Sequence, residues 1–154
     1  MNTPVELRDA IDSDLDDMCV IEQAVFDNEA WSRQAMYSEL TGPHRRYFAA
    51  IGQHGQLVGY AGVLIVGEEA DIQTIALTPE ARGSGSGRLL MNALLTEARA
   101  KGATQVFLEV RADNLVARGL YVSLGFEQIA VRPGYYQPAN VDAIVMRLLM
   151  EKWQ

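Results

Sequence analysis

Apolar and polar positions along this chain follow two periods, one of two residues and one of three to four. Strands are expected where apolar residues alternate with polar ones, or run together between glycine, proline and other turn residues. By this pattern we predict strands at residues 5–8, 47–51, 57–66, 71–77, 105–111, 127–132 and 143–149. Helices are expected where apolar residues recur every three or four positions. We predict one helix that starts at Ser13 and three more at residues 33–40, 89–101 and 114–124.

The order of these elements indicates the fold class. The predicted order is β-α-α-β-β-β-α-β-α-β-β, with both hairpins and crossovers, which is typical of an α/β fold. The hydroxyls of Ser13 and Ser32 stand where two of the helices begin, so we predict that each caps the first free amides of its helix. A length of 154 residues fits a single domain, residues 1–154.

Composition and charge narrow the function classes. Apolar residues make up 49% of the chain and charged residues 21%, which is ordinary globular usage. One cysteine excludes an internal disulfide and a cysteine-rich zinc site, and the two histidines give no sign of another metal site. The net charge of −7 argues against nucleic acid as a partner. Because no leader segment or membrane-spanning apolar run is visible, we expect a cytoplasmic protein without a membrane partner.

Three glycines at alternate positions separate a predicted strand from a predicted helix. The segment reads Arg82, Gly83, Ser84, Gly85, Ser86, Gly87, Arg88. Glycine lets the backbone approach a ligand closely, and the helix that follows presents free N–H groups and a positive dipole end, so the segment suits a phosphate group. The dinucleotide fingerprint fails because position 88 is arginine, and the P-loop fails because no Gly-Lys-Ser/Thr follows. The alternative is a flexible turn that binds no ligand.

The spacing Arg82-x-x-Gly85-x-Gly87 resembles the acyl-CoA pyrophosphate motif of the GNAT superfamily of N-acetyltransferases. The resemblance extends over nearly the whole chain. Within the superfamily, the chain looks most like the RimI-type ribosomal-protein alanine N-acetyltransferases. The matching segments are Ile21-Glu22-Gln23, Trp31-Ser32, Ile75-Ala76-Leu77-Thr78-Pro79, Leu108-Glu109-Val110-Arg111, Asn114, Leu120-Tyr121-x-x-Leu124-Gly125-Phe126, Tyr135-Tyr136 and Asp142-Ala143-Ile144-Val145-Met146. The resemblance implies a single mixed, mostly antiparallel sheet flanked by helices, and acetyl-CoA as the cosubstrate.

The resemblance also implies catalytic roles for Glu109 and Tyr121. Glu109 would be the base that takes a proton from the attacking amine, and Tyr121 the acid that protonates the leaving thiolate. The residue types fit these roles. An α-amine has a pKa of about 7.7–8.0, so a carboxylate base is enough to help deprotonate it, and a phenol is a suitable proton donor to a thiolate. The alternatives are a solvated glutamate on the outer face of a strand and an aromatic side chain that only packs.

The remaining site residues implied by the resemblance belong to the cosubstrate or to the acceptor. For acetyl-CoA they are the backbone of Ile75, Ala76 and Leu77, the whole segment 82–88, and Asn114, which equally suits a helix cap. For the acceptor they are Trp31, Tyr135 and Tyr136. The acceptor that the resemblance implies is the N-terminus of a ribosomal protein that begins with alanine. Each of these aromatic residues can instead pack on the core.

Three functions stay open at this point. The first is an N-terminal protein acetyltransferase that is a monomer or a weak dimer. The second is an acetyltransferase for a small-molecule amine or an internal lysine, and the third is a regulatory module that binds acyl-CoA without turnover. Gly83 and Ser86 stand where the family has a basic and a bulky apolar residue, so we expect a more flexible loop with one cation fewer, which leaves room for the third.

Overall fold

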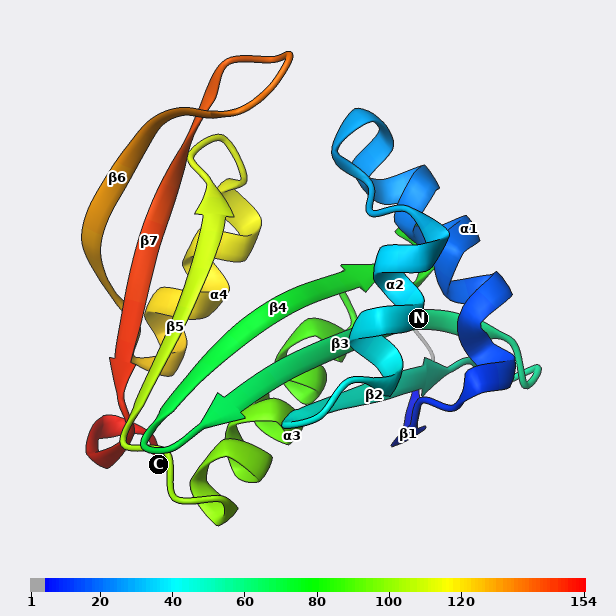
Figure 1. The fold of residues 1–154 in the computed structure, drawn as a ribbon, viewed down its shortest axis with the longest axis horizontal. Coiled ribbons are helices and arrows are strands. Elements are labelled where there is room, and N and C mark those ends of the chain that lie inside the picture. The colour runs from blue at the N-terminus through cyan, green and yellow to red at the C-terminus, as the bar shows by residue number, and fades with distance from the viewer. Residues whose placement is uncertain (1–4) are drawn as a thin grey trace.

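The computed structural model describes residues 5–154, so residues 1–4 of the predicted domain lie outside the described part. Within it, seven strands form one sheet in the order β1-β2-β3-β4-β5-β7-β6 (Figure 1). The strands are β1 (Glu6–Asp9), β2 (Arg45–Ile51), β3 (Leu57–Val66), β4 (Glu69–Leu77), β5 (Gln105–Arg111), β6 (Glu127–Tyr136) and β7 (Val141–Leu149). The helices are α1 (Leu15–Phe26), α2 (Arg33–Thr41), α3 (Ser86–Ala100) and α4 (Leu115–Leu124), and the short 3-10 turns are η1 (Asp12–Asp14), η2 (Asp27–Glu29), η3 (Pro79–Ala81) and η4 (Met150–Lys152).

The predicted α/β class and the mixed, mostly antiparallel sheet are confirmed. Of the strand pairs formed within residues 5–154, β4–β5 is parallel and the other five are antiparallel. The antiparallel neighbours β2, β3 and β4 follow one another through short turns, whereas the parallel pair needs a crossover, which α3 supplies. In the same range, no helix is both long and apolar enough to cross a membrane.

Helices cover both faces of the sheet, and within residues 5–154 the buried apolar side chains form two clusters (Figure 1). The larger cluster packs α3 and α4 against the sheet, and its helical members include Leu90, Met91, Leu94, Leu95, Tyr121 and Leu124. The smaller cluster packs α1 and α2 against the other face, with Leu15, Met18, Ile21, Met36, Tyr47, Tyr60 and Ala76. The periodic apolar faces seen in the sequence are therefore the buried faces, as expected for helices that cover a sheet.

One of the two predicted helix caps is confirmed and the other is wrong. The hydroxyl oxygen of Ser32 accepts a hydrogen bond from the N–H of Ala35 at 3.1 Å, at the start of α2. Ser13 lies inside η1 and caps nothing, because α1 begins only at Leu15. The carboxylate of the neighbouring Asp14 serves this turn instead, where it accepts a hydrogen bond from the N–H of Ile11 at 2.8 Å.

Two element boundaries differ from the sequence prediction in ways that matter for the site. Helix α3 begins at Ser86, inside the glycine segment, rather than at residue 89. Strand β6 continues to Tyr136 rather than ending at residue 132, so Tyr135 and Tyr136 lie on a strand and not in a loop. Proline in a sequence usually ends a strand, but β6 is at the edge of the sheet, where Pro133 needs no N–H for a second neighbour.

Close packing of β3 against β2 gives a stability prediction. A Cβ atom at Gly62 would lie 2.2 Å from Cζ of the buried Tyr47. We expect Gly62→Ala to lower the free energy of unfolding by about 1–3 kcal/mol and the Tm by roughly 2–12 °C. The matched control is Gly119→Ala in α4, where a Cβ meets no atom within 4 Å. That variant should be more stable by about 0.5–1 kcal/mol, because alanine favours a helix over glycine.

Thermal unfolding followed by circular dichroism measures both changes. A Gly62→Ala protein as stable as the wild type would contradict the close contact between the two strands.

Candidate functional site

The parallel strands β4 and β5 run side by side over a short stretch and then diverge. Within the described residues, the last registered pair is Asp71 with Phe107, and beyond it the strands spread apart (Figure 1). A bulge bends β4 here, because Ile72 and Thr74 pair with consecutive residues of β3 and leave Gln73 as the extra residue. The β4 edge beyond the bulge therefore presents backbone N–H and C=O groups that β5 does not pair.

A cleft of about 190 Å³ occupies this opening. Its walls come from both diverging strands, the end of α1, η2, the beginning of α4 and the end of β6. The lining residues are Glu22, Phe26, Glu29, Trp31, Ile72, Gln73, Thr74, Ile75, Leu108, Glu109, Val110, Arg111, Asn114, Tyr121 and Tyr136. Both residues expected to be catalytic are among them, together with two of the three expected on the acceptor side.

Glu109 lies near the end of β5. Its side chain is on the face of the strand opposite to the buried side chains. Its neighbours Leu108 and Val110 are buried, as the alternation in the sequence predicts. The Glu109 carboxylate lies in the cleft wall and is paired with Arg132 of β6 at 3.5 Å between Oε2 and Nε. This contact is too long to be a strong hydrogen bond, so the carboxylate oxygens keep the capacity to accept a hydrogen bond from a group in the cleft.

Tyr121 reaches the same cleft from α4. Its side chain is 5% exposed and its ring packs on that of Phe126, with ring centres 6.0 Å apart. Burial, with a smaller contribution from Tyr136, raises the pKa of Tyr121 to about 12. The phenol therefore stays protonated at neutral pH and is able to act as a hydrogen-bond or proton donor.

The structure separates the aromatic residues expected on the acceptor side. Trp31 lines the cleft and is held there by a hydrogen bond from its backbone N–H to the carboxylate of Glu22, at 2.9 Å. Tyr136 also lines the cleft, and burial together with the charge of Glu109 raises its pKa to about 12. Tyr135 points elsewhere: it is exposed, lies outside the cleft lining, and packs edge-on against Tyr136 and beneath Arg132.

The glycine segment forms the turn from η3 into α3. Gly85 precedes the first helical turn with φ at +84°, in the left-handed region that favours glycine, and a Cβ there would meet no atom within 4 Å. The backbone is therefore open to a ligand beside the N–H groups that begin α3. Ser86 is buried and its hydroxyl contacts that of Ser84 at 2.8 Å, so these serines also hold the turn together.

Two arginines bracket this turn on the protein surface. Nε of Arg82 donates to the carbonyl oxygen of Leu77 at 3.1 Å, and Nη2 of Arg88 donates to the hydroxyl of Ser123 at 2.7 Å. The first contact ties the turn to the end of β4 and the second ties it to α4. The two guanidinium groups thus bring positive charge to the region of the glycine turn, which would favour a phosphate group bound there.

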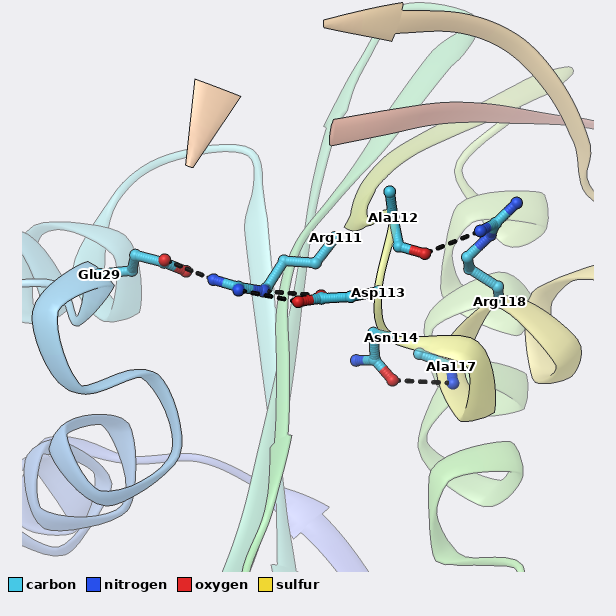
Figure 2. A network of polar contacts seen from close by, with 7 residues as sticks. All are labelled: Glu29, Arg111, Ala112, Asp113, Asn114, Ala117 and Arg118. Carbon is cyan, nitrogen blue, oxygen red and sulfur yellow. Dashed lines mark hydrogen bonds and ion pairs between the residues drawn. The ribbon is translucent and has the colours of Figure 1, made fainter. Parts of the chain in front are cut away.

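The other residues expected to contact acetyl-CoA lie along the two sides of the opening. Ile75 lines the cleft, whereas Ala76 and Leu77 continue the same strand beyond it and offer their backbone only. Asn114 caps α4, because its side-chain oxygen accepts a hydrogen bond from the N–H of Ala117 at 3.1 Å (Figure 2). That bond leaves the NH2 group of Asn114 available in the cleft.

Three charged residues of the cleft were not singled out by sequence reasoning. Glu22 stands on an otherwise apolar helix stripe, which was a usable signal. It is 2% exposed and accepts hydrogen bonds from the N–H of Trp31 and the hydroxyl of Tyr60. No local pattern in the sequence pointed to Glu29 as a residue of the site. Arg111, at the end of the Leu108–Arg111 motif, forms an ion pair with Glu29 (Figure 2).

The charges that line the cleft favour a cationic acceptor. Among the described lining residues, Glu22, Glu29 and Glu109 are carboxylates and Arg111 is the cation, which leaves an excess of negative charge. The first two carboxylates are already occupied, by Trp31 with Tyr60 and by Arg111 respectively. Glu109 has the loosest partner of the three, so it is the carboxylate most open to a hydrogen bond from a bound group.

Comparison with known proteins gives one consistent result. The sequence profile of the acetyltransferase (GNAT) family matches residues 13–126. An uncharacterized protein of Mycobacterium leprae is 38% identical over 151 residues, 95% of this chain, and the chain spans 41% of that protein's length. The N-alpha-acetyltransferase RimI of Mycobacterium tuberculosis is 40% identical over 124 residues, covering 78% of this chain and 76% of that protein. The crystal structure of the ribosomal-protein-S18-alanine N-acetyltransferase from Escherichia coli has a TM-score of 0.86 at 32% identity, over 95% of this chain and 94% of that chain.

Proposed function

We propose that this chain, which belongs to the acetyltransferase (GNAT) family, transfers the acetyl group of acetyl-CoA to the α-amine at the N-terminus of a protein. The main support is a single arrangement: an acidic cleft where β4 and β5 diverge, with Glu109 and Tyr121 in its walls and the glycine turn beyond one of its edges. An acceptor amine and a thioester can meet there beside a base and an acid.

The residues present suit acetyl-CoA as the donor substrate. The turn at Gly85 and the first amides of α3 offer donors to its phosphate groups, flanked by Arg82 and Arg88. The open edge of β4 from Ile75 to Leu77 offers backbone groups to an extended pantetheine arm, as an added strand would use them. Asn114, whose side-chain oxygen caps α4, lines the cleft and is the proposed contact on that side.

The proposed chemistry is a direct transfer. Glu109 takes a proton from the amine, the amine nitrogen forms a bond to the acetyl carbon, and the carbon–sulfur bond breaks. Tyr121 donates a proton to the sulfur as it leaves and takes up the second proton that the nitrogen loses on becoming an amide, so that a thiol and an amide are the products. Glu109 then returns its proton to solvent. A carboxylate base is sufficient because an α-amine has a pKa of about 7.7–8.0, far below that of a lysine side chain at about 10.4.

The acceptor that fits best is a ribosomal protein beginning with alanine, in the cytoplasm where ribosomes are made. The name of the M. tuberculosis relative describes N-alpha-acetyl transfer, and that of the E. coli relative specifies the alanine of a ribosomal protein. Trp31 and Tyr136 line the cleft, which supports the proposal that they contact a peptide entering it. Other N-termini remain within the same proposal, since nothing in the lining selects for alanine alone.

A peptide panel tests the proposed function. Short peptides that differ in their first residue (alanine, serine, glycine or methionine) are incubated with the protein and acetyl-CoA, and mass spectrometry counts the acetyl groups gained. A further peptide has a blocked N-terminus and an internal lysine. We expect one acetyl group on free N-termini, fastest for alanine, and none on the blocked peptide.

The same panel, extended with free polyamines and with a measurement of acetyl-CoA binding, separates the rival functions. Acetylation of the blocked peptide would move the protein to lysine chemistry, and acetylation of free polyamines alone would move it to small-molecule amines. Binding of acetyl-CoA without transfer to any acceptor would identify a regulatory module.

A further inference from the structure

Arg111 contacts two other parts of the cleft wall, η2 and β6, and Figure 2 shows its ion pair with η2. Its Nη1 donates to the carboxylate of Glu29 on η2, while Nε and Nη2 form a fork on Asp113 at 3.0 and 3.1 Å. Its guanidinium also lies 5.5 Å from the ring centre of Tyr136 on β6. The contact with Glu29 spans the cleft between residues 82 positions apart in the sequence, whereas the fork on Asp113 is local.

The Glu29–Arg111 pair is better shielded than an ordinary surface ion pair. The side chain of Glu29 is 19% exposed and that of Arg111 is 29% exposed. Hydrogen bonds to Asp113 and to Glu29 raise the pKa of Arg111, so the guanidinium is charged at every pH at which the protein is studied. Partial burial weakens screening by solvent. The charges of this pair therefore interact electrostatically with charged groups of a ligand bound nearby.

If an extended acceptor runs along β5 from Glu109 toward Arg111, strand geometry brings the Glu29–Arg111 pair beside the residues that follow the acceptor amine. Arg111 stands two positions after Glu109 on the same face of β5, about 6.6–6.8 Å further along the strand. An extended peptide advances about 3.3–3.6 Å per residue. If the amine is at Glu109, the second and third residues of an extended acceptor are level with Arg111 and with its partner Glu29.

We propose that the Glu29–Arg111 pair determines specificity for the charge of the second and third residues of the acceptor peptide. This inference rests on the proposed peptide acceptor. Arg111 with Glu29 and Asp113 carries one positive and two negative charges, a net −1. Arg111→Gln makes this group −2, Glu29→Gln makes it 0, and the double variant returns it to −1. The two single variants therefore shift charge preference in opposite directions.

The test measures kcat/KM for two peptides that begin with alanine and differ only in carrying two lysines or two aspartates next. For the wild type, the ratio of these two values defines the preference. We expect Arg111→Gln to raise the lysine-over-aspartate ratio about fivefold or more and Glu29→Gln to lower it by a similar factor, because one changed charge acts on the four-unit charge difference between the peptides in a site that solvent and salt screen. The KM for acetyl-CoA should stay unchanged in both.

The double variant Arg111→Gln with Glu29→Gln distinguishes charge from architecture. It has lost the bridge completely, yet we expect its ratio to return to that of the wild type. The matched control is Glu127→Gln, which removes a carboxylate from the exposed pair with Lys152 outside the cleft, and it should leave the ratio unchanged.

Two results would overturn this inference in distinguishable ways. A wild-type protein that acetylates neither peptide would overturn the proposed function and this inference with it. A wild type that acetylates both, with single variants that lose activity equally on the two peptides, would retain the proposed function and leave the pair as a structural bridge only.

Discussion

Glu109→Gln is expected to lower kcat for peptide acetylation by about 10²-fold or more at pH 6, and by much less at pH 9. A positioned base contributes typically 10²–10⁴-fold to a proton-transfer step. Below a pKa of about 7.7–8.0 the α-amine carries an extra proton that must be removed before attack, so the carboxylate is needed most there. At pH 9 most of the amine is already neutral, and the variant should approach the wild type.

The measurement is kcat as a function of pH for the wild type and the variant, with saturating acetyl-CoA. Glutamine keeps the length of the side chain, so binding of acetyl-CoA, measured by calorimetry, should be unchanged. Glu127→Gln on β6 is the control, because its carboxylate is exposed and lies outside the cleft lining. A deficit of the same size at every pH would show that Glu109 has some other role, and an unchanged kcat would remove it from the reaction.

Strand and helix positions were predictable because each is set by a local pattern. Strands β3 and β5 have the bounds expected from their apolar runs, which turn residues delimit on both sides. Strand β6 was underestimated at Pro133, whose effect depends on whether the strand is central or at the edge, and that is a property of the whole sheet. Ser13 failed as a cap because it lies inside η1, two residues before α1 begins at Leu15.

The cleft itself was much less predictable than its catalytic candidates. Glu109 stands out as a carboxylate in an apolar strand, and Tyr121 follows in a recognisable motif. The divergence of β4 from β5 has no such signal, since it depends on a bulge at Gln73 that only the register with β3 reveals. The contact between Glu29 and Arg111 also joins segments that are far apart in the sequence, so no local residue spacing predicts it.

Tyr121→Phe is expected to lower kcat by about 10²–10³-fold with little dependence on pH between 6 and 10. Loss of one donor aimed at a developing negative charge has an effect of this size. Because the pKa of Tyr121 is about 12, the phenol is protonated throughout this range, so the wild type gains or loses nothing from its ionisation. The flat deficit distinguishes Tyr121 from Glu109, whose deficit should rise as pH falls.

The raised pKa also indicates how Tyr121 acts on the leaving group. An alkyl thiol has a pKa of about 8.5, so full transfer of the proton from a phenol near 12 is uphill by about 3.5 pKa units, or roughly 5 kcal/mol. We therefore expect Tyr121 to stabilise the thiolate mainly through a hydrogen bond, with transfer completed as the product leaves. Phenylalanine keeps the ring that packs on Phe126, so the Tm should change little. Tyr37→Phe on the exposed side of α2 is the control. A Tyr121→Phe protein with wild-type kcat and an unchanged Tm would show that this buried phenol only packs.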